Sequence, residues 1–137
     1  MNIDIRFKTA FATLFVTLAP GESIVAEAGA MASMSRHIQI KTRFNGGFFK
    51  ALMRKIFGGE SLFINTFHCP QGSTPGQLVL TQPTPGDLQT IDLAGQSLFL
   101  QPGAYVASTP GVNLGLGFAG FASWFGGEGL FKLQVSG

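Results

Sequence analysis

ESIVAEAGA (residues 22–30) recurs 74 residues later as QSLFLQPGA (residues 96–104), and FGGESLF (residues 57–63) recurs 68 residues later as FGGEGLF (residues 125–131). Self-similarity at a nearly constant offset indicates that one structural unit occurs twice in the chain. The offset falls from 74 to 68, so the first copy holds six extra residues between Gly47 and Phe57. We therefore define repeat one as about residues 22–69 and repeat two as about residues 96–137.

Apolar and polar residues alternate through much of each copy, as they do in half-buried β-strands. The pattern is clearest in IQIKTRF (residues 38–44), where one face is expected to be buried and the other wet. Residues 1–8 alternate in the same way, and the apolar run at residues 11–18 predicts a buried strand. Gly- and Pro-rich turns at residues 71–76 and 83–87 bracket a further strand.

These patterns predict an all-β fold in which pseudo-symmetric β-hairpin units form a sandwich or barrel. The length of 137 residues predicts a single β domain over residues 1–137. Because an incomplete sheet leaves an exposed edge, we expect one of two completions, either a third repeat that this chain lacks or a second subunit. The 35 uncharged residues at 93–127 are expected to be buried against one of these.

The composition is that of a packed domain, with 45% hydrophobic and 12% charged residues, which argues against intrinsic disorder. The single cysteine, Cys69, excludes a disulfide within the chain and favours a reducing, cytoplasmic location. The apolar run at residues 11–18 is too short to cross a bilayer. Nothing in residues 1–8 is typical of a secretory signal.

Basic residues are concentrated in one segment, since six of the nine lie between Glu27 and Glu60 with no acidic residue among them. The segment comprises Arg36, Lys41, Arg43, Lys50, Arg54 and Lys55. It could orient the molecule toward an anionic surface, or it could simply keep a strand face and a helix solvated. Both interpretations stay open at this point.

The insertion in repeat one is the best candidate for function, since residues 48–57 predict a short basic amphipathic helix. A shorter aromatic segment occupies the same place in repeat two. Such segments contact an anionic membrane, cover a subunit interface, or plug the protein's own core. The candidate residues for a membrane or interface contact are Phe48, Phe49, Lys50, Leu52, Met53, Arg54, Lys55, Phe121, Trp124 and Phe125.

Each copy of the repeat also carries a Gly-Gly-Glu motif, which we interpret structurally. Glu60 and Glu128 follow glycine pairs at equivalent positions, where a carboxylate can accept backbone N–H bonds and anchor a turn. The turn anchors are therefore predicted to be Gly58, Gly59, Glu60, Gly126, Gly127 and Glu128.

Residues suited to catalysis or metal binding are few. His37 and His68 are far apart in sequence, and Cys69 follows His68 directly, so the two side chains would point to opposite faces of a strand. A one-chain metal site would lack ligands. Gly115, Gly117 and Gly120 have the spacing of a nucleotide-binding motif without its strand-to-helix context. We therefore expect no catalytic residue, no metal and no cofactor.

Several motifs in this order resemble a known family. They are AEAGAM (residues 26–31), FGGESLFINTF (residues 57–67), PGD (residues 85–87), GAYVAS (residues 103–108) and FGGEGLF (residues 125–131). From about residue 10 onward the chain resembles the mitochondrial-biogenesis family named for altered inheritance of mitochondria. The resemblance implies a fold similar to the tryptophan RNA-binding attenuation protein, of the double-stranded β-helix type. It also implies a non-enzymatic role, and family members that continue for roughly another repeat.

Together these observations predict a self-associating, non-enzymatic β-scaffold or interaction protein, a homo-oligomer of the cytoplasm that could contact an anionic membrane at the periphery of the inner membrane. The alternative is a nucleic-acid-binding protein, suggested by the implied fold and by the basic segment. Against it, basic and aromatic residues are not interleaved in a recognisable RNA-binding motif. A metal-dependent, cupin-like enzyme is a distant third.

Overall fold

The computed structural model describes residues 1–43, 64–101, 103–118 and 131–137. The described residues fall into two compact units. Unit 1 contains residues 1–43, 64–90 and 106–110, and unit 2 contains residues 91–101, 103–105, 111–118 and 131–137. The prediction of a single domain stays a prediction, and each unit is described by itself below.

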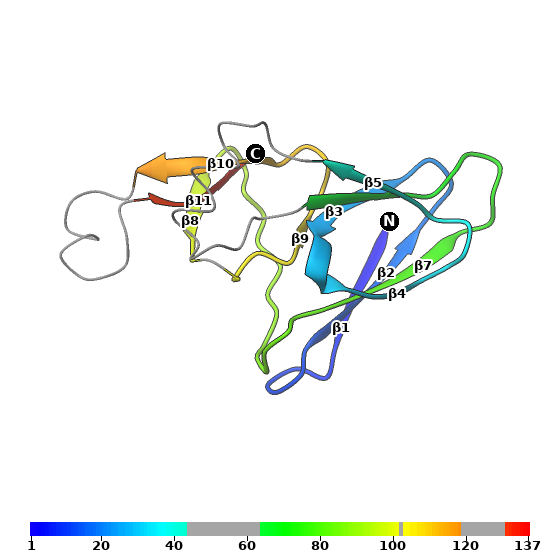
Figure 1. Ribbon diagram of the computed structural model, residues 1–137, viewed down its shortest axis with the longest axis horizontal. Coiled ribbons are helices and arrows are strands. Elements are labelled where there is room, and N and C mark those ends of the chain that lie inside the picture. Colours follow the sequence, from blue (N-terminus) through cyan, green and yellow to red (C-terminus); the bar gives the residue numbers. More distant parts are fainter. Residues whose placement is uncertain (44–63, 102, 119–130) are drawn as a thin grey trace. The chain divides into compact units, whose positions relative to one another are not determined.

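The first sheet of unit 1 has the strand order β1-β2-β7-β4, with every neighbouring pair antiparallel. Its strands are β1 (Asn2–Arg6), β2 (Thr13–Leu18), β7 (Gly76–Thr81) and β4 (Met31–Met34). The side chains of β2 alternate between buried and half-buried, as expected for a strand with one face on the core. Figure 1 shows β2 and β7 side by side in this sheet.

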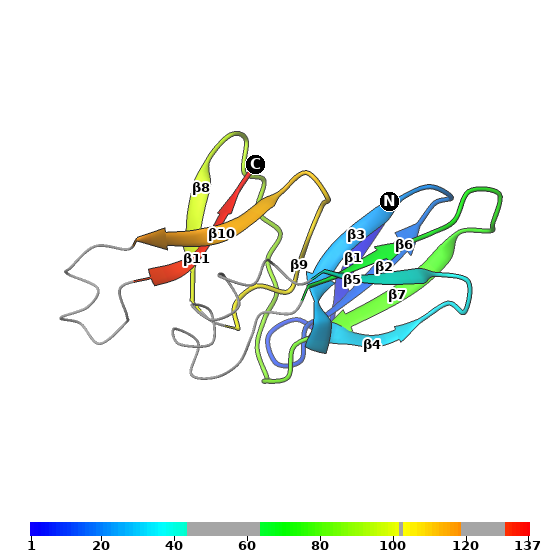
Figure 2. The ribbon, with the colours of Figure 1, turned by 45° about the horizontal axis from the view of Figure 1, so that its top comes forward.

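The second sheet of unit 1 has the order β5-β6-β3-β9, again antiparallel throughout. Its strands are β5 (Gln39–Arg43), β6 (Ile64–His68), β3 (Ser23–Glu27) and β9 (Ala107–Ser108). A 3-10 turn, η1 (Ala28–Ala30), follows β3 and leads directly into β4 of the other sheet. The small residues of this turn let the chain pass between the layers (Figures 1 and 2).

The two sheets of unit 1 share one hydrophobic core, which gives the unit the two-layer packing of a β-sandwich. Val16 and Leu78 come from the first sheet, Ile24 and Phe67 from the second, and each side chain is at most 2% exposed. Cys69, just after β6, is also fully buried in this core. Burial of these apolar side chains is the main source of the unit's stability.

Unit 2 contains one antiparallel sheet with the order β10-β11-β8. Its strands are β10 (Asn113–Phe118), β11 (Phe131–Ser136) and β8 (Ser97–Leu100), drawn in orange, red and yellow-green in Figure 2. Leu133 and Val135 of β11 are buried on one face of this sheet. None of the three sheets of the two units closes into a barrel within the described residues.

The strand registers in the two copies are related by the offsets found in the sequence. Ser23 pairs with His68 between β3 and β6, and Ser97 pairs with Ser136 between β8 and β11. Gln39 likewise pairs with His68, and Asn113 with Ser136. Adding 74 to residues of β3 and β5, and 68 to residues of β6, therefore converts the pairing of one copy into that of the other.

The turn before each copy shows the same relation. The amide of Glu22 donates to the carbonyl of Ala19 over 3.0 Å, and that of Gln96 donates to Leu93 over 2.7 Å. Gly21 and Gly95 adopt φ angles of 87° and 82° in these turns, a region where a Cβ atom causes strain. The correspondence thus extends three residues upstream of the sequence match.

The prediction of an all-β protein is confirmed, and so are the strands expected near residues 1–8, 11–18, 38–44 and 77–81. One detail is wrong: the apolar face of β5 is not fully buried, because Ile40 is 39% exposed. The reason is that β5 is the outermost strand of its sheet, with β6 as its neighbour on one side only. The helix predicted at residues 48–57 lies outside the described residues.

Candidate functional site

The candidate contact residues and turn anchors chosen from the sequence lie outside the described residues. This applies to Phe48, Phe49, Lys50, Leu52, Met53, Arg54, Lys55, Phe121, Trp124 and Phe125, and to Gly58, Gly59, Glu60, Gly126, Gly127 and Glu128. Of the basic segment, the structure describes the side chains of Arg36 and Lys41, and both are exposed. Any candidate site in the described part of the chain therefore consists of residues other than these.

His68 and Cys69 are held in structural contacts, whereas Nε2 of His37 is buried without a hydrogen-bond partner among the described residues. His68 Nδ1 lies 2.9 Å from the hydroxyl of Ser23, its cross-strand partner on β3. The Cys69 Sγ atom lies 3.3 Å from Ser73 Oγ and 3.5 Å from the carbonyl oxygen of Thr74. Within the ranges that the structure describes, no three His, Cys, Asp or Glu side chains gather in a metal-binding cluster.

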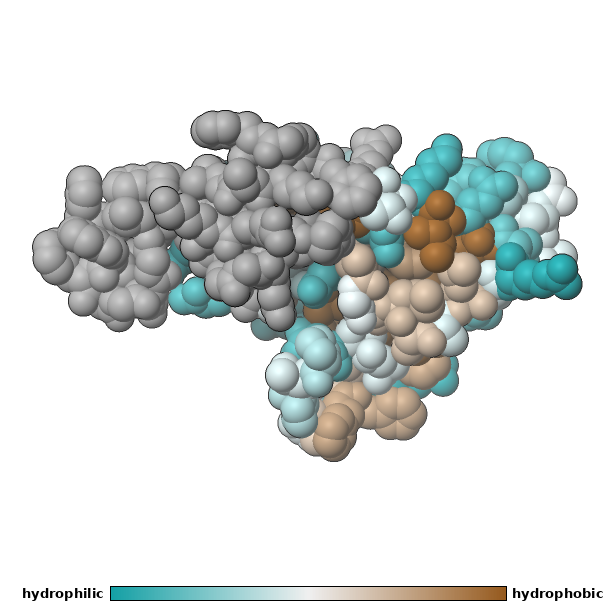
Figure 3. Space-filling model, in the orientation of Figure 1, coloured by the Kyte–Doolittle hydropathy of each residue, from teal (hydrophilic) through white to brown (hydrophobic). Residues whose placement is uncertain are grey.

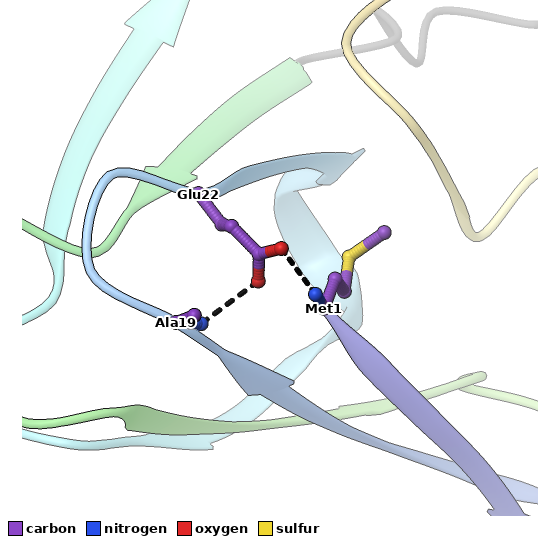
Figure 4. A network of polar contacts seen from close by, with 3 residues as sticks. All are labelled: Met1, Ala19 and Glu22. Carbon is purple, nitrogen blue, oxygen red and sulfur yellow. Dashed lines mark hydrogen bonds and ion pairs between the residues drawn. The ribbon is translucent and has the colours of Figure 1, made fainter.

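Glu22 organises the polar contacts at the start of repeat one, as Figure 4 shows. Its carboxylate accepts a hydrogen bond from the N-terminal ammonium group of Met1 and another, of 2.8 Å, from the amide of Ala19. The ammonium contact, followed by the Ala19 contact, lowers the pKa of Glu22 below its ordinary value of 4.5. Glu22 therefore ties β1 to the turn that leads into β3.

We expect this contact to make stability depend on pH in a defined direction. A carboxylate whose pKa is lowered on folding adds stability above its unfolded pKa, and this stability is lost as the pH falls through the folded pKa. Urea unfolding of the wild type and of Glu22→Gln should therefore differ at pH 6, begin to approach each other below about pH 4.5, the ordinary value for this group, and coincide only below the lowered pKa of the folded state. Midpoints separated by the same amount at every pH would contradict this role.

Inward-facing apolar side chains are incompletely covered at the outer strands of the sandwich. Ile3 of β1 pairs with Val16 and shares its face of the sheet, yet Ile3 is 40% exposed while Val16 is fully buried. Ile40 of β5 pairs with the buried Phe67 and is 39% exposed. The apolar faces of both sheets thus extend past the covered core at β1 and β5.

The loop between β1 and β2 adds two exposed aromatic side chains. Phe7 is 66% and Phe11 68% exposed, and Figure 3 shows apolar, brown atoms at the lower end of the molecule where this loop lies. The ring of Phe7 contacts Phe15 edge-on at 6.4 Å between centroids, and the Arg6 guanidinium lies 4.5 Å from the centre of the Phe15 ring. These contacts fix Phe7 at the start of the loop, while the Phe11 ring at its end stays exposed.

In unit 2, strand β8 forms one edge of the three-stranded sheet. Phe99 on this strand is 50% exposed. A Cβ atom placed on Gly117 of β10 would lie 2.1 Å from Cε1 of Phe99, so the Phe99 ring covers this glycine. Because β11 lies between β8 and β10, the ring reaches across its own sheet to cover the backbone of this glycine. The ring therefore leans over its own sheet and away from the free edge of β8.

Exposed apolar side chains at sheet edges are a candidate contact surface that sequence patterns missed. The alternation in residues 38–44 assigns Ile40 to a buried face, and only the strand order shows that this face is open. The described part of the chain contains no helix of the length and hydropathy needed to cross a membrane. The arrangement is suited to contact with another polypeptide.

Comparison with known proteins gives the chain a family and a fold. The model of the family described as mitochondrial biogenesis AIM24 matches residues 3–137. An uncharacterised protein of Streptococcus pyogenes serotype M6 is 26% identical, and the match covers all of this chain and 57% of that protein. The crystal structure of protein SPYM3_0169 from Streptococcus pyogenes is similar with a TM-score of 0.70 and 24% identity, over 99% of this chain and 60% of that one. The chain thus spans less than two thirds of the length of both.

Proposed function

Since the chain belongs to the mitochondrial biogenesis AIM24 family, we propose that it is a non-enzymatic β-scaffold that associates with copies of itself. The observation that carries this proposal is the open apolar surface at the sheet edges, represented by Ile3, Ile40 and Phe99. Apolar side chains left uncovered at an edge are stabilised when a second polypeptide removes them from water. The proposed site of action is the cytoplasm, at the periphery of the inner membrane.

The finer fold type belongs to the same proposal. We assign the chain to the double-stranded β-helix type, built from pseudo-symmetric repeats. The support is the register correspondence between β5-β6-β3 and β10-β11-β8, which follows the sequence offsets at every pair compared. Repetition of one sheet along a chain is a common route to assemblies with repeated contacts.

The membrane and nucleic-acid alternatives depend on other parts of the chain. Membrane contact was assigned to residues 48–57 and 121–125, which lie outside the described residues. Nucleic-acid binding depends on the basic segment, of which Arg36 and Lys41 have described side chains. No observation in the described residues favours either function over self-association.

The proposal predicts that the purified protein is larger than one chain in solution. Light scattering at tens of micromolar should give a mass at least twice the 14.5 kDa of the chain, and dilution should lower it. Because apolar burial drives the contact, added sodium sulfate should increase the mass. A particle of 14.5 kDa at every concentration and salt condition would overturn the proposal.

A further inference from the structure

The three sheets follow one plan, and in the described residues the sheet of unit 2 has three strands where the other two sheets have four. Each begins with an antiparallel hairpin, β1-β2, β5-β6 or β10-β11, followed by a third strand, β7, β3 or β8. In the first two sheets a fourth strand, β4 or β9, pairs antiparallel with the third. Within the described residues, β8 has β11 on one side and no strand on the other.

The free edge of β8 carries none of the features that discourage strand pairing. Natural edge strands are protected by charged residues, prolines or bulges. Among the outer strands of unit 1, β1 contains Asp4 and Arg6, β5 contains Lys41, β4 has a bulge between Met31 and Ser33, and β9 has only two residues. Strand β8 reads Ser-Leu-Phe-Leu, without charge or proline. Its edge is therefore chemically competent to accept another strand.

We infer that β8 is the contact between two copies of this chain, which pair their β8 strands antiparallel about a two-fold axis perpendicular to the sheet. This inference rests on the proposed self-association and gives it a location. The named strands of the described residues all pair antiparallel, and a two-fold axis of this orientation places two identical strands antiparallel. The product is a six-stranded sheet in the order β10-β11-β8 followed by β8-β11-β10 of the second copy.

The two-fold symmetry restricts which residues of the two β8 strands can lie opposite each other. The axis keeps each face of the sheet continuous, so residues directly opposite each other must lie on the same face. The register centred on Phe99 places Phe99 opposite Phe99 of the second copy, and Leu98 opposite Leu100. Leu98 and Leu100 pair with Val135 and Leu133, which are 6% and 3% exposed. Apolar residues thus continue the buried face across the contact.

Self-complementarity favours a second copy over an unrelated strand. In this register Leu98 lies opposite Leu100 of the second copy, and cross-strand apolar pairs stabilise a sheet. Because the Phe99 ring leans over Gly117, it leaves the backbone edge clear for hydrogen bonds. The segments that supply fourth strands, β4 and β9, already pair with β7 and β3. They are therefore not free to fill this place.

Phe99→Lys tests the contact by placing two lysines opposite each other across the two-fold axis. Like charges at directly opposite positions are destabilising. Sedimentation velocity should show the dissociation constant raised at least tenfold. The control is Ile91→Lys, which introduces the same charge at a 55% exposed position outside β8 and should leave association unchanged.

Phe99→Cys tests the register and does not depend on the lysine variant being folded. Cβ atoms of directly opposite residues lie about 4.5–5.5 Å apart, so the two cysteines should form a disulfide between chains under mild oxidation. The native Cys69 is fully buried, so the wild type should not cross-link. Ile91→Cys supplies an equally accessible thiol and should cross-link far more slowly.

The combined results of these experiments distinguish failure of the β8 contact from failure of the proposed self-association. Cross-linking of Phe99→Cys well above Ile91→Cys, with weakened association of a folded Phe99→Lys, supports the β8 contact. If Phe99→Lys associates as strongly as the wild type and Phe99→Cys does not cross-link, the β8 contact is wrong. Self-association of the wild type would still hold in that case. A wild type that is monomeric at all concentrations overturns both.

Discussion

Replacing Phe67 by alanine is expected to lower the free energy of unfolding by about 3–5 kcal/mol, as found for buried phenylalanines in general. Phe67 on β6 pairs with Ile24 on one side and Ile40 on the other, and is fully buried. Its removal leaves a cavity between the two sheets of unit 1. Urea unfolding followed by circular dichroism measures the loss.

Phe11→Ala is the matched control, because the same atoms are removed from a side chain that is 68% exposed. Its cost should stay within about 0.5 kcal/mol, as for most surface substitutions. Equal losses for the two variants would mean that the core assigned to unit 1 is not where its stability resides.

Gly76→Ala is expected to destabilise the protein by about 1–3 kcal/mol through overpacking. A Cβ atom at Gly76 would lie 2.8 Å from Cγ1 and 2.9 Å from Cδ1 of Ile38, and 3.2 Å from Nε2 of His37. Ile38 is 4% exposed and belongs to the core, so it has little room to move. The midpoint of thermal unfolding should fall accordingly.

Gly111→Ala provides the comparison for the same chemical change. No atom lies within 4 Å of a Cβ atom placed on Gly111. Its φ angle also lies outside the left-handed range that favours glycine. This variant should match the wild type within about 0.5 kcal/mol. A loss at Gly111 as large as at Gly76 would argue against tight packing around Ile38.

The local elements of this protein could be predicted because they depend on neighbouring residues. Alternation at residues 38–44 identifies β5, and turn residues on both sides identify β7. The turns at Gly21 and Gly95 could also have been found, since these glycines are separated by the same 74 residues as the repeated motif. Alternation and turn residues need only the chain within about ten residues, and the repeat needs only a comparison of the sequence with itself.

Pairing between distant strands could not be predicted in the same way. Strand β9 has two residues and pairs with β3, about 80 residues earlier, and nothing in Ala107 or Ser108 specifies that partner. The exposure of Ile40 and the free edge of β8 both follow from strand order. The candidate contact at β8 therefore depends on the strand order of all three sheets and is not contained in any one segment of the sequence.

The constant register of the two hairpins has a consequence for how this chain tolerates insertions. Arg43 pairs with Ile64 across residues 44–63, whereas the equivalent pair, Gly117 with Lys132, spans residues 118–131. The six additional residues of the first connection leave the strand pairing unchanged, and by polymer statistics a flexible connection that is longer by six residues costs only about 0.3 kcal/mol more to close. Foreign sequence, such as an epitope or a fluorescent reporter, could therefore be grafted at this junction. New recognition properties could likewise arise there by gradual lengthening, with the frame beneath unchanged.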